Sequence, residues 1–214
     1  GVQAVWDLSR AHRETTPTRE RICINGLWRW QPAASTENVV PEVGWGYFKV
    51  PGSWPGITSY LQKDSQTVHA HPNWKPVAWG NLDAAWYQRE FTVPADWAGR
   101  RIGLNVETLN SFAAVFVDGN QAGEIRFPGG EADLTALCRP GSTHQLSLLV
   151  VALPLKGVML SHSDSASARE VKGSVERRGL CGEVFLVSTP AEARLTEVTI
   201  DTSVRKGEIT VNCV

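Results

Sequence analysis

Short runs of alternating apolar and polar residues are the feature that most constrains how this chain can fold. They recur along the 214 residues, and each is bounded by Gly, Pro, Asn or Asp, whereas helical periodicity is scarce. The clearest runs are "WYQREFTV" (86–93), "RIGLNVET" (101–108), "FAAVFVD" (112–118), "HQLSLLVV" (144–151) and "EVFLVS" (183–188). Because successive side chains of a strand point to opposite faces, this pattern predicts an all-β sandwich or jelly roll.

A tight-turn signal, Asp118-Gly119-Asn120, follows the run that ends at residue 117. An Asp-Gly or Gly-Asn step tolerates positive φ, and a two-residue primed turn made from it matches the twist of the strands that it joins. The sequence therefore predicts a hairpin here, with a structural role for Asp118.

Composition and charge narrow the classes of partner. The chain is 42% apolar and 20% charged with a formal net charge of −1, so no overall field favours nucleic acid or a membrane surface. No run reaches the roughly 18 apolar residues of a transmembrane helix.

No two of the four cysteines, Cys23, Cys138, Cys181 and Cys213, have C-x-x-C spacing, which argues against a zinc site or a thioredoxin motif. They are either free thiols in the interior or, in an exported protein, disulfide partners.

Two segments lack strand periodicity. Residues 51–85 are rich in Pro, Gly and Trp, and so long an irregular stretch is typical of a functional loop or an interface. Residues 161–174, "SHSDSASAREVKGS", are small and polar, which predicts an exposed loop.

All nine tryptophans lie within the first 97 residues. Trp54, Trp74 and Trp79 fall in or beside the Pro/Gly-rich segment, where an indole face could stack on a sugar ring or dock against another domain. The alternative is ordinary packing within the loops.

No set of residues predicts catalysis or metal binding. "SHSD" (161–164) places Ser, His and Asp too close together to converge as a triad, and "HAH" (69–71) has no third ligand nearby. Glycoside hydrolysis needs two carboxyl groups held roughly 5 to 9.5 Å apart. Nothing in the sequence pairs the scattered glutamates 107, 124, 131, 176 and 183. We expect no catalytic residue, no metal site and no cofactor.

The order of several motifs carries a family resemblance. A Trp-Tyr-x-Arg-x-Phe strand (86–91) is followed by Val-Pro-x-x-Trp-x-Gly-x-Arg (in 93–100), by Val-x-Val-Asp-Gly-x-x-x-Gly (115–123), by Gly129-Gly130, by Asp-Leu-Thr (133–135) and by Pro140-Gly141. Upstream stand "INGLWRW" (24–30) and "FKVPGSWPG" (48–56), and downstream stands "RGLCGEVFLVSTP" (178–190). In this order, over roughly residues 20–190, they resemble the amino-terminal sugar-binding domain of glycoside hydrolase family 2.

That resemblance implies a jelly roll of the galactose-binding type over residues 1–190. In the family, an immunoglobulin-like sandwich and then a (β/α)₈ barrel with the two catalytic glutamates follow this domain. Residues 191–214 resemble the first strands of that sandwich, so the barrel lies outside this sequence. The family's sugar-pocket loop aligns loosely with Tyr60 and Gln62, which join the three tryptophans as candidate carbohydrate-binding residues.

Two departures from the family pattern affect its sugar contact. Active galactosidases and glucuronidases of the family carry an Asp six residues before the Gly of the closing strand, where this chain has Gly173. The usual Arg three residues after that Gly is Gly182 here. These departures favour weak carbohydrate binding.

The resemblance leads to one main hypothesis and one alternative. The main hypothesis is a non-catalytic amino-terminal domain of a multidomain family 2 β-glycosidase, exported by a bacterium to the periplasm or the medium. The alternative is an autonomous carbohydrate-binding module or lectin. We expect Leu195, Val198, Ile200, Ile209, Val211 and Cys213 to lie on a buried side of the tail, either against the jelly roll or, as we favour, against the same tail of a second copy.

Overall fold

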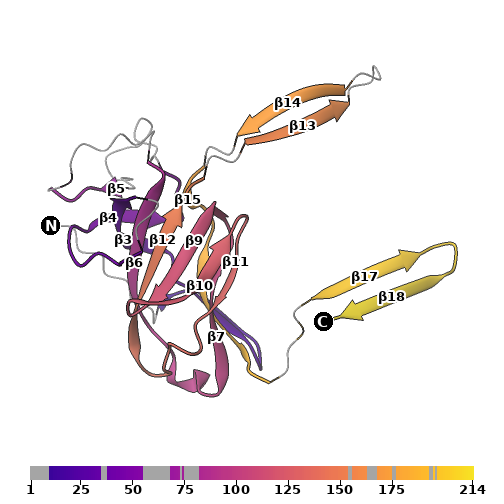
Figure 1. Cartoon of the computed structure of the whole chain (residues 1–214). Coiled ribbons are helices and arrows are strands. Elements are labelled where there is room, and N and C mark those ends of the chain that lie inside the picture. The colour runs from indigo at the N-terminus through magenta and orange to yellow at the C-terminus, as the bar shows by residue number, and fades with distance from the viewer. Residues whose placement is uncertain are drawn as a thin grey trace.

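A computed structural model of the chain shows two packed β-sheets with two hairpins that project from them (Figure 1). It describes residues 10–34, 38–54, 68–72, 74, 82–153, 156–162, 168–174, 177–192, 195 and 197–214, and in 156–162 and 168–174 it describes the backbone. These residues include one short 3-10 helix between strands, η4 (Ala95–Trp97). No helix in the described part of the chain is long and apolar enough to span a bilayer.

The smaller sheet, sheet A, has the strand order β1-β2-β16-β7-β11. Its strands are β1 (Arg13–Thr15), β2 (Glu20–Cys23), β16 (Val184–Pro190), β7 (Arg100–Val106) and β11 (Gly130–Asp133). All of its pairings are antiparallel. The pairings of β16 with β2 and with β7 thus join residues that are far apart in the sequence.

The larger sheet, sheet B, has the order β10-β9-β12-β6-β3-β4-β5 and is also antiparallel. Its strands are β10 (Asn120–Arg126), β9 (Phe112–Val117), β12 (Thr143–Val151), β6 (Ala84–Thr92), β3 (Gly26–Ala33), β4 (Gly46–Val50) and β5 (Val68–His69). A two-strand pairing of β8 (Leu109–Asn110) with β15 (Gly179–Leu180) lies at one end of the sandwich. The five alternating runs of the sequence correspond to β6, β7, β9, β12 and β16, and the predicted all-β jelly-roll sandwich is confirmed.

The predicted hairpin joins β9 to β10 through a two-residue turn. Asp118 has φ 50° and Gly119 has φ 80°, and Val117 pairs with Asn120. The Asp118 carboxylate accepts a hydrogen bond from the Gln145 backbone N–H at 2.8 Å and contacts His144 Nδ1 at 2.6 Å. Burial alone would raise the pKa of Asp118, but these hydrogen bonds outweigh it and hold the pKa below its usual range. Asp118 therefore ties the turn to β12, as a structural residue does.

The core between the sheets is dominated by aromatic side chains around Trp30, which is fully buried. The Trp30 ring stacks on Phe48 at a centroid distance of 5.4 Å and makes edge contacts with Trp74 at 5.5 Å and Tyr87 at 6.3 Å. Such pairs add to the stability that burial of their area provides. The tryptophan-rich first half of the chain therefore supplies much of the packing of the fold.

The segment that precedes β16 closes over this aromatic core. Trp54 donates a backbone hydrogen bond to the Arg178 carbonyl at 2.9 Å, and its Nε1–H donates to the Tyr87 hydroxyl at 2.6 Å. Gly179, with φ 98°, lies directly against these two side chains, and a Cβ at this position would clash with the Trp54 indole and the Tyr87 hydroxyl. Only glycine permits both the backbone conformation and the close approach.

The four cysteines are all free. Cys138 is buried, and burial raises the pKa of its thiol to about 12, so it stays protonated. Cys23 and Cys181 are half-buried and Cys213 is exposed, so the expectation of buried thiols is confirmed for Cys138 and is wrong for Cys213. No disulfide supports the fold.

The expectation of a loop over residues 161–174 is wrong for most of that range. Strand β13 (Lys156–His162) pairs antiparallel with β14 (Ala168–Ser174), and the hairpin projects from the end of the sandwich where β15 lies (Figure 1). The prediction of irregular structure rested on the polar composition of this segment. It failed because the backbone hydrogen bonds of a hairpin do not require apolar side chains.

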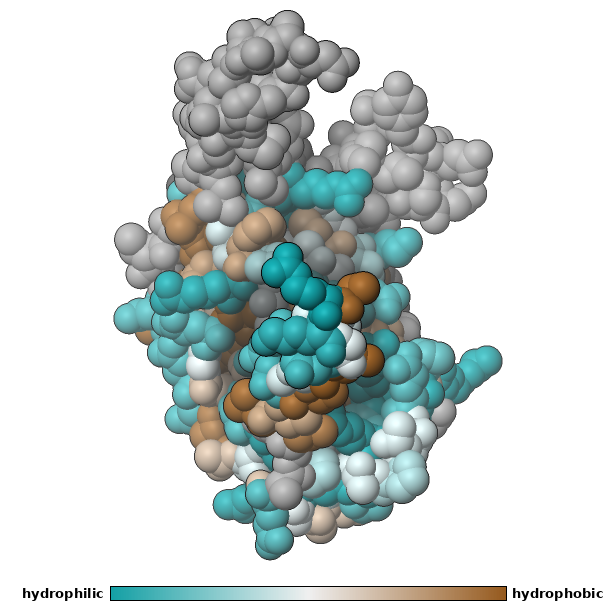
Figure 2. All heavy atoms as spheres, turned by 90° about the vertical axis from the view of Figure 1, so that its right-hand side faces the viewer, coloured by the Kyte–Doolittle hydropathy of each residue, from teal (hydrophilic) through white to brown (hydrophobic). Residues whose placement is uncertain are grey.

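The carboxyl-terminal hairpin pairs β17 (Val198–Ser203) with β18 (Glu208–Cys213) and stands apart from the sandwich (Figure 1). Its register places five apolar side chains on one face: Val198, Ile200, Ile209, Val211 and Cys213. All are exposed, and Figure 2, which views the molecule from this side, shows apolar residues gathered along one side of the hairpin. The predicted alternation is present, but the predicted burial is absent within the single chain, because no second layer covers this face.

The closure at Gly179 can be tested with a matched pair of glycine variants. Gly179→Ala combines an unfavourable backbone conformation with the clash against Trp54 and Tyr87, and we expect it to lower the free energy of unfolding by at least about 3 kcal/mol. Gly119→Ala, where φ is also positive but no atom lies within 4 Å of the added Cβ, should cost only about 1 kcal/mol. Urea unfolding followed by tryptophan fluorescence measures the free energy of unfolding of both variants. Equal losses would contradict the close packing of Gly179 against Trp54 and Tyr87.

Candidate functional site

Trp54 was a candidate for sugar stacking, and the structure places it in the core. Its ring is 0% exposed, lies at 6.5 Å from Trp30 in an edge contact, and has the Arg178 guanidinium over it at 6.0 Å. A ring enclosed in this way has no face to present to a sugar. The structure therefore favours packing over sugar stacking as the role of Trp54.

Trp74 is half-buried and packs against the same core. Its Nε1–H donates to the Gly44 carbonyl at 2.6 Å, which fixes the ring against the start of β4. Its contact with carbohydrate stays a prediction. The three other candidates, Tyr60, Gln62 and Trp79, lie outside the described residues.

The two departures from the family pattern have different structural settings. Gly182 donates its N–H to the Thr108 carbonyl at 2.8 Å. A Cβ at this position would clash with Thr108 and would lie closer to Glu107 than ordinary van der Waals contact allows. The backbone here leaves little room for the arginine of the family pattern. Gly173 lies in β14 and pairs with Gly157.

Several of the carboxylates that have described side chains lie in ion pairs. Arg101 binds both Glu131 and Asp133, Glu124 pairs with Arg126 at 3.0 Å, and Glu107 lies 3.9 Å from Arg21. In the part of the chain that the structure describes, no group of three or more His, Cys, Asp or Glu could hold a metal ion. His69 and His71 each lie half-buried at the edge of sheet B.

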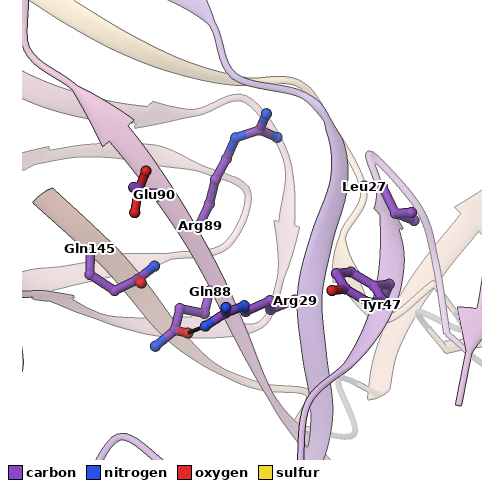
Figure 3. A pocket seen from close by; sticks show the side chains of 7 residues that line it. All are labelled: Leu27, Arg29, Tyr47, Gln88, Arg89, Glu90 and Gln145. Carbon is purple, nitrogen blue, oxygen red and sulfur yellow. Dashed lines mark hydrogen bonds between the residues drawn. The ribbon is translucent and has the colours of Figure 1, made fainter. Parts of the chain in front are cut away.

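A polar depression on the outer face of sheet B was not predicted from the sequence. It has a volume of about 260 Å³ and is lined by residues of β3, β4, β6 and β12, namely Leu27, Arg29, Tyr47, Gln88, Arg89, Glu90 and Gln145 (Figure 3). In the figure, Gln145 and Arg29 reach toward Gln88 from opposite sides. Polar residues at alternate positions 88 and 90 of an otherwise buried strand were the one signal of this site in the sequence.

Arg89 belongs to the Trp-Tyr-x-Arg-x-Phe motif and is a buried member of this lining, and its guanidinium is directed at the turn between β2 and β3. It is 6% exposed, and its Nη1 donates to the carbonyls of Ile24 at 2.8 Å and Asn25 at 3.0 Å. Burial lowers the pKa of this guanidinium to about 10. Arg89 thus links β6 to the turn between β2 and β3, which is a structural role.

Comparison with known proteins shows that the chain is similar to part of several β-glucuronidases. No protein-family model matches it. It is 26% identical to a β-glucuronidase of Felis catus over 89% of this chain and 32% of the relative, and 26% identical to a β-glucuronidase of Paenibacillus borealis over 63% of this chain and 22% of the relative. The chain therefore spans about a third or less of the length of these relatives.

Solved structures show the same fold. The β-glucuronidase of Ruminococcus gnavus aligns with a TM-score of 0.67 at 16% identity, over 95% of this chain and 34% of that protein. The relatives match most of the chain and the neighbours share its sandwich. Together they confirm the resemblance of this chain to the amino-terminal sugar-binding domain of glycoside hydrolase family 2.

Proposed function

We propose that this chain is the non-catalytic amino-terminal domain of a multidomain family 2 β-glycosidase, in which it supports the catalytic barrel. The observation that carries the proposal is the extent of the match: the β-glucuronidase of Felis catus aligns with 89% of this chain, but the aligned part is only 32% of that relative's length. The missing length is what an immunoglobulin-like domain and a barrel would occupy. The parent's hydrolase activity, its substrate and its export from the cell are parts of the same proposal.

The carboxyl-terminal hairpin supports the proposed continuation. One face of β17 and β18 is apolar and the other is polar, which is the pattern of a strand pair from a two-layer sandwich. We infer that this face is the first part of the immunoglobulin-like domain and that further strands cover it in the parent protein.

The non-catalytic role predicts that the 214-residue chain hydrolyses no glycoside. Three glutamates that line one surface cavity, Glu14, Glu20 and Glu131, are each paired with an arginine, whereas glycoside hydrolysis needs one carboxyl group as the acid and a second as the base or nucleophile. The measurement is release of nitrophenol from the β-galactoside, β-glucuronide, β-mannoside and β-glucoside. Turnover that survives a second, independent purification would overturn the role.

The exposed apolar face predicts self-association of this chain in the absence of covering strands. Pairing with the hairpin of a second copy would remove the side chains of Val198, Ile200 and Val211 from water, which is favourable by about 25 cal/mol per Å² of apolar area. Light scattering should show a dimer for residues 1–214 and a monomer for a chain that ends at Pro190. If both chains are monomers at the same high concentration, the prediction is wrong.

A further inference from the structure

We propose that the outer face of sheet B binds an extended oligosaccharide along a row of polar side chains that crosses the strands. The antiparallel register pairs Ser147 with Gln88, Gln88 with Arg29, Arg29 with Tyr47, and Tyr47 with His69. These five residues, here called the outer polar row, come from β12, β6, β3, β4 and β5. With about 4.8 Å between neighbouring strands, the row is about 19 Å long.

The row lies on the face opposite to the core. Trp30, Phe48 and Tyr87 alternate with row residues along β3, β4 and β6, and all three are buried between the sheets. Since successive side chains of a strand point to opposite faces, the row residues point away from the core. The middle of the row, around Gln88 and Arg29, is the depression shown in Figure 3.

The floor of the row is fixed by hydrogen bonds between its own members. Gln88 is only 7% exposed although it points away from the core. Its Oε1 accepts from Arg29 Nη1 at 3.2 Å, and its Nε2 donates to Ser147 Oγ at 3.3 Å. Because Ser147 is fully enclosed and Gln88 nearly so, they support the exposed Arg29 guanidinium from below, and a ligand would meet that guanidinium already oriented, which lowers the entropic cost of binding.

Around this floor stand polar groups with unused hydrogen-bonding capacity. Among the described residues, the side chains of Tyr47, Glu90 and Gln145 make no hydrogen bond or ion pair with one another or with a neighbour. Together they offer a phenol, a carboxylate and an amide, so both donors and acceptors are available. The exposed guanidinium of Arg29 keeps further N–H donors beyond the one that Gln88 accepts.

This chemistry fits a carbohydrate chain better than other ligands. Sugar hydroxyls both donate and accept, as the row does, and planar amide, carboxylate and guanidinium groups can bind two neighbouring hydroxyls at once. Arg29 and Glu90 have opposite charges, so the site does not favour a polyphosphate backbone. The depression of about 260 Å³ is smaller than the roughly 300–1,000 Å³ of an enclosing small-molecule site. It therefore suits an extended chain that lies across the face, with little affinity for one free sugar.

The inference deepens the proposed function, on which it rests for the class of ligand, and assigns the carbohydrate contact to residues other than the loop tryptophans. The binding of soluble β-linked glucan, xylan, mannan, galactan and hyaluronan to the 214-residue chain can be measured by affinity electrophoresis and then by calorimetry with the corresponding oligosaccharides. We expect at least one of these glycans to bind, and to bind better than its monosaccharide.

The decisive comparison uses two arginines on sheet B. Arg29→Ala removes the charged donor from the row and should weaken binding by about tenfold or more. Arg126→Ala, at the far strand β10 with a side chain that is 77% exposed, removes the same charge outside the row and should change binding by less than about twofold. Thermal unfolding of both variants checks that the fold is retained, and Arg29→Lys reports whether the planar guanidinium is needed in a folded chain.

The outcomes separate this inference from the proposed function. Absence of binding to every glycan, or equal weakening by Arg29→Ala and Arg126→Ala, would overturn the outer polar row as a site and leave the scaffold role intact. Hydrolysis of nitrophenyl glycosides by the chain would overturn the non-catalytic role and leave the row intact.

Discussion

The hydrogen bond from Trp54 Nε1 to the Tyr87 hydroxyl is the interaction on which one end of the sandwich depends. It is 2.6 Å long, and both side chains are fully buried. Burial raises the pKa of Tyr87 well above its usual value, so the phenol stays neutral. Its oxygen accepts the hydrogen bond that the Trp54 indole N–H donates. In water each group would find a partner at no cost, but in this core each has to find one within the protein. The bond thereby fixes the start of the Pro/Gly-rich segment to β6, and the absence of a side chain at Gly179 lets the closing segment pack over both rings.

This arrangement explains why the sequence predicted the fold better than the site. Alternation along one strand is a local property, so β6, β7, β9, β12 and β16 could be located from single runs of residues. The turn at Asp118 and Gly119 was equally local. Whether Trp54 lies in the core or on the surface depends on Tyr87 and Gly179, which are distant in the sequence, and composition alone cannot distinguish these cases. The hairpin of β13 and β14 was missed because polar residues hide strand periodicity.

The outer polar row was missed for a related reason. Neighbouring members of the row are separated by as many as 59 residues, as Gln88 and Ser147 are, and only the strand register brings them into line. Within each strand they look like the solvent-facing half of an alternating pattern. The outer face of sheet A differs, since Arg101 and Arg21 there already pair with carboxylates. The two sheets therefore share a core but present outer faces of different chemistry: charged pairs on sheet A, and on sheet B free hydrogen-bonding groups beside an apolar cluster around Trp86 and Phe116.

A double-mutant cycle on Trp54 and Tyr87 tests most directly the claim that this hydrogen bond, and not sugar stacking, accounts for Trp54. The free energy of unfolding would be measured for the original chain, Trp54→Phe, Tyr87→Phe and the double variant. The account predicts a coupling of about 1 kcal/mol or more, because Tyr87→Phe leaves the buried Trp54 N–H without this acceptor, and Trp54→Phe removes one of the hydrogen bonds of the Tyr87 hydroxyl. Additive losses, with no coupling beyond about 0.3 kcal/mol, would contradict it.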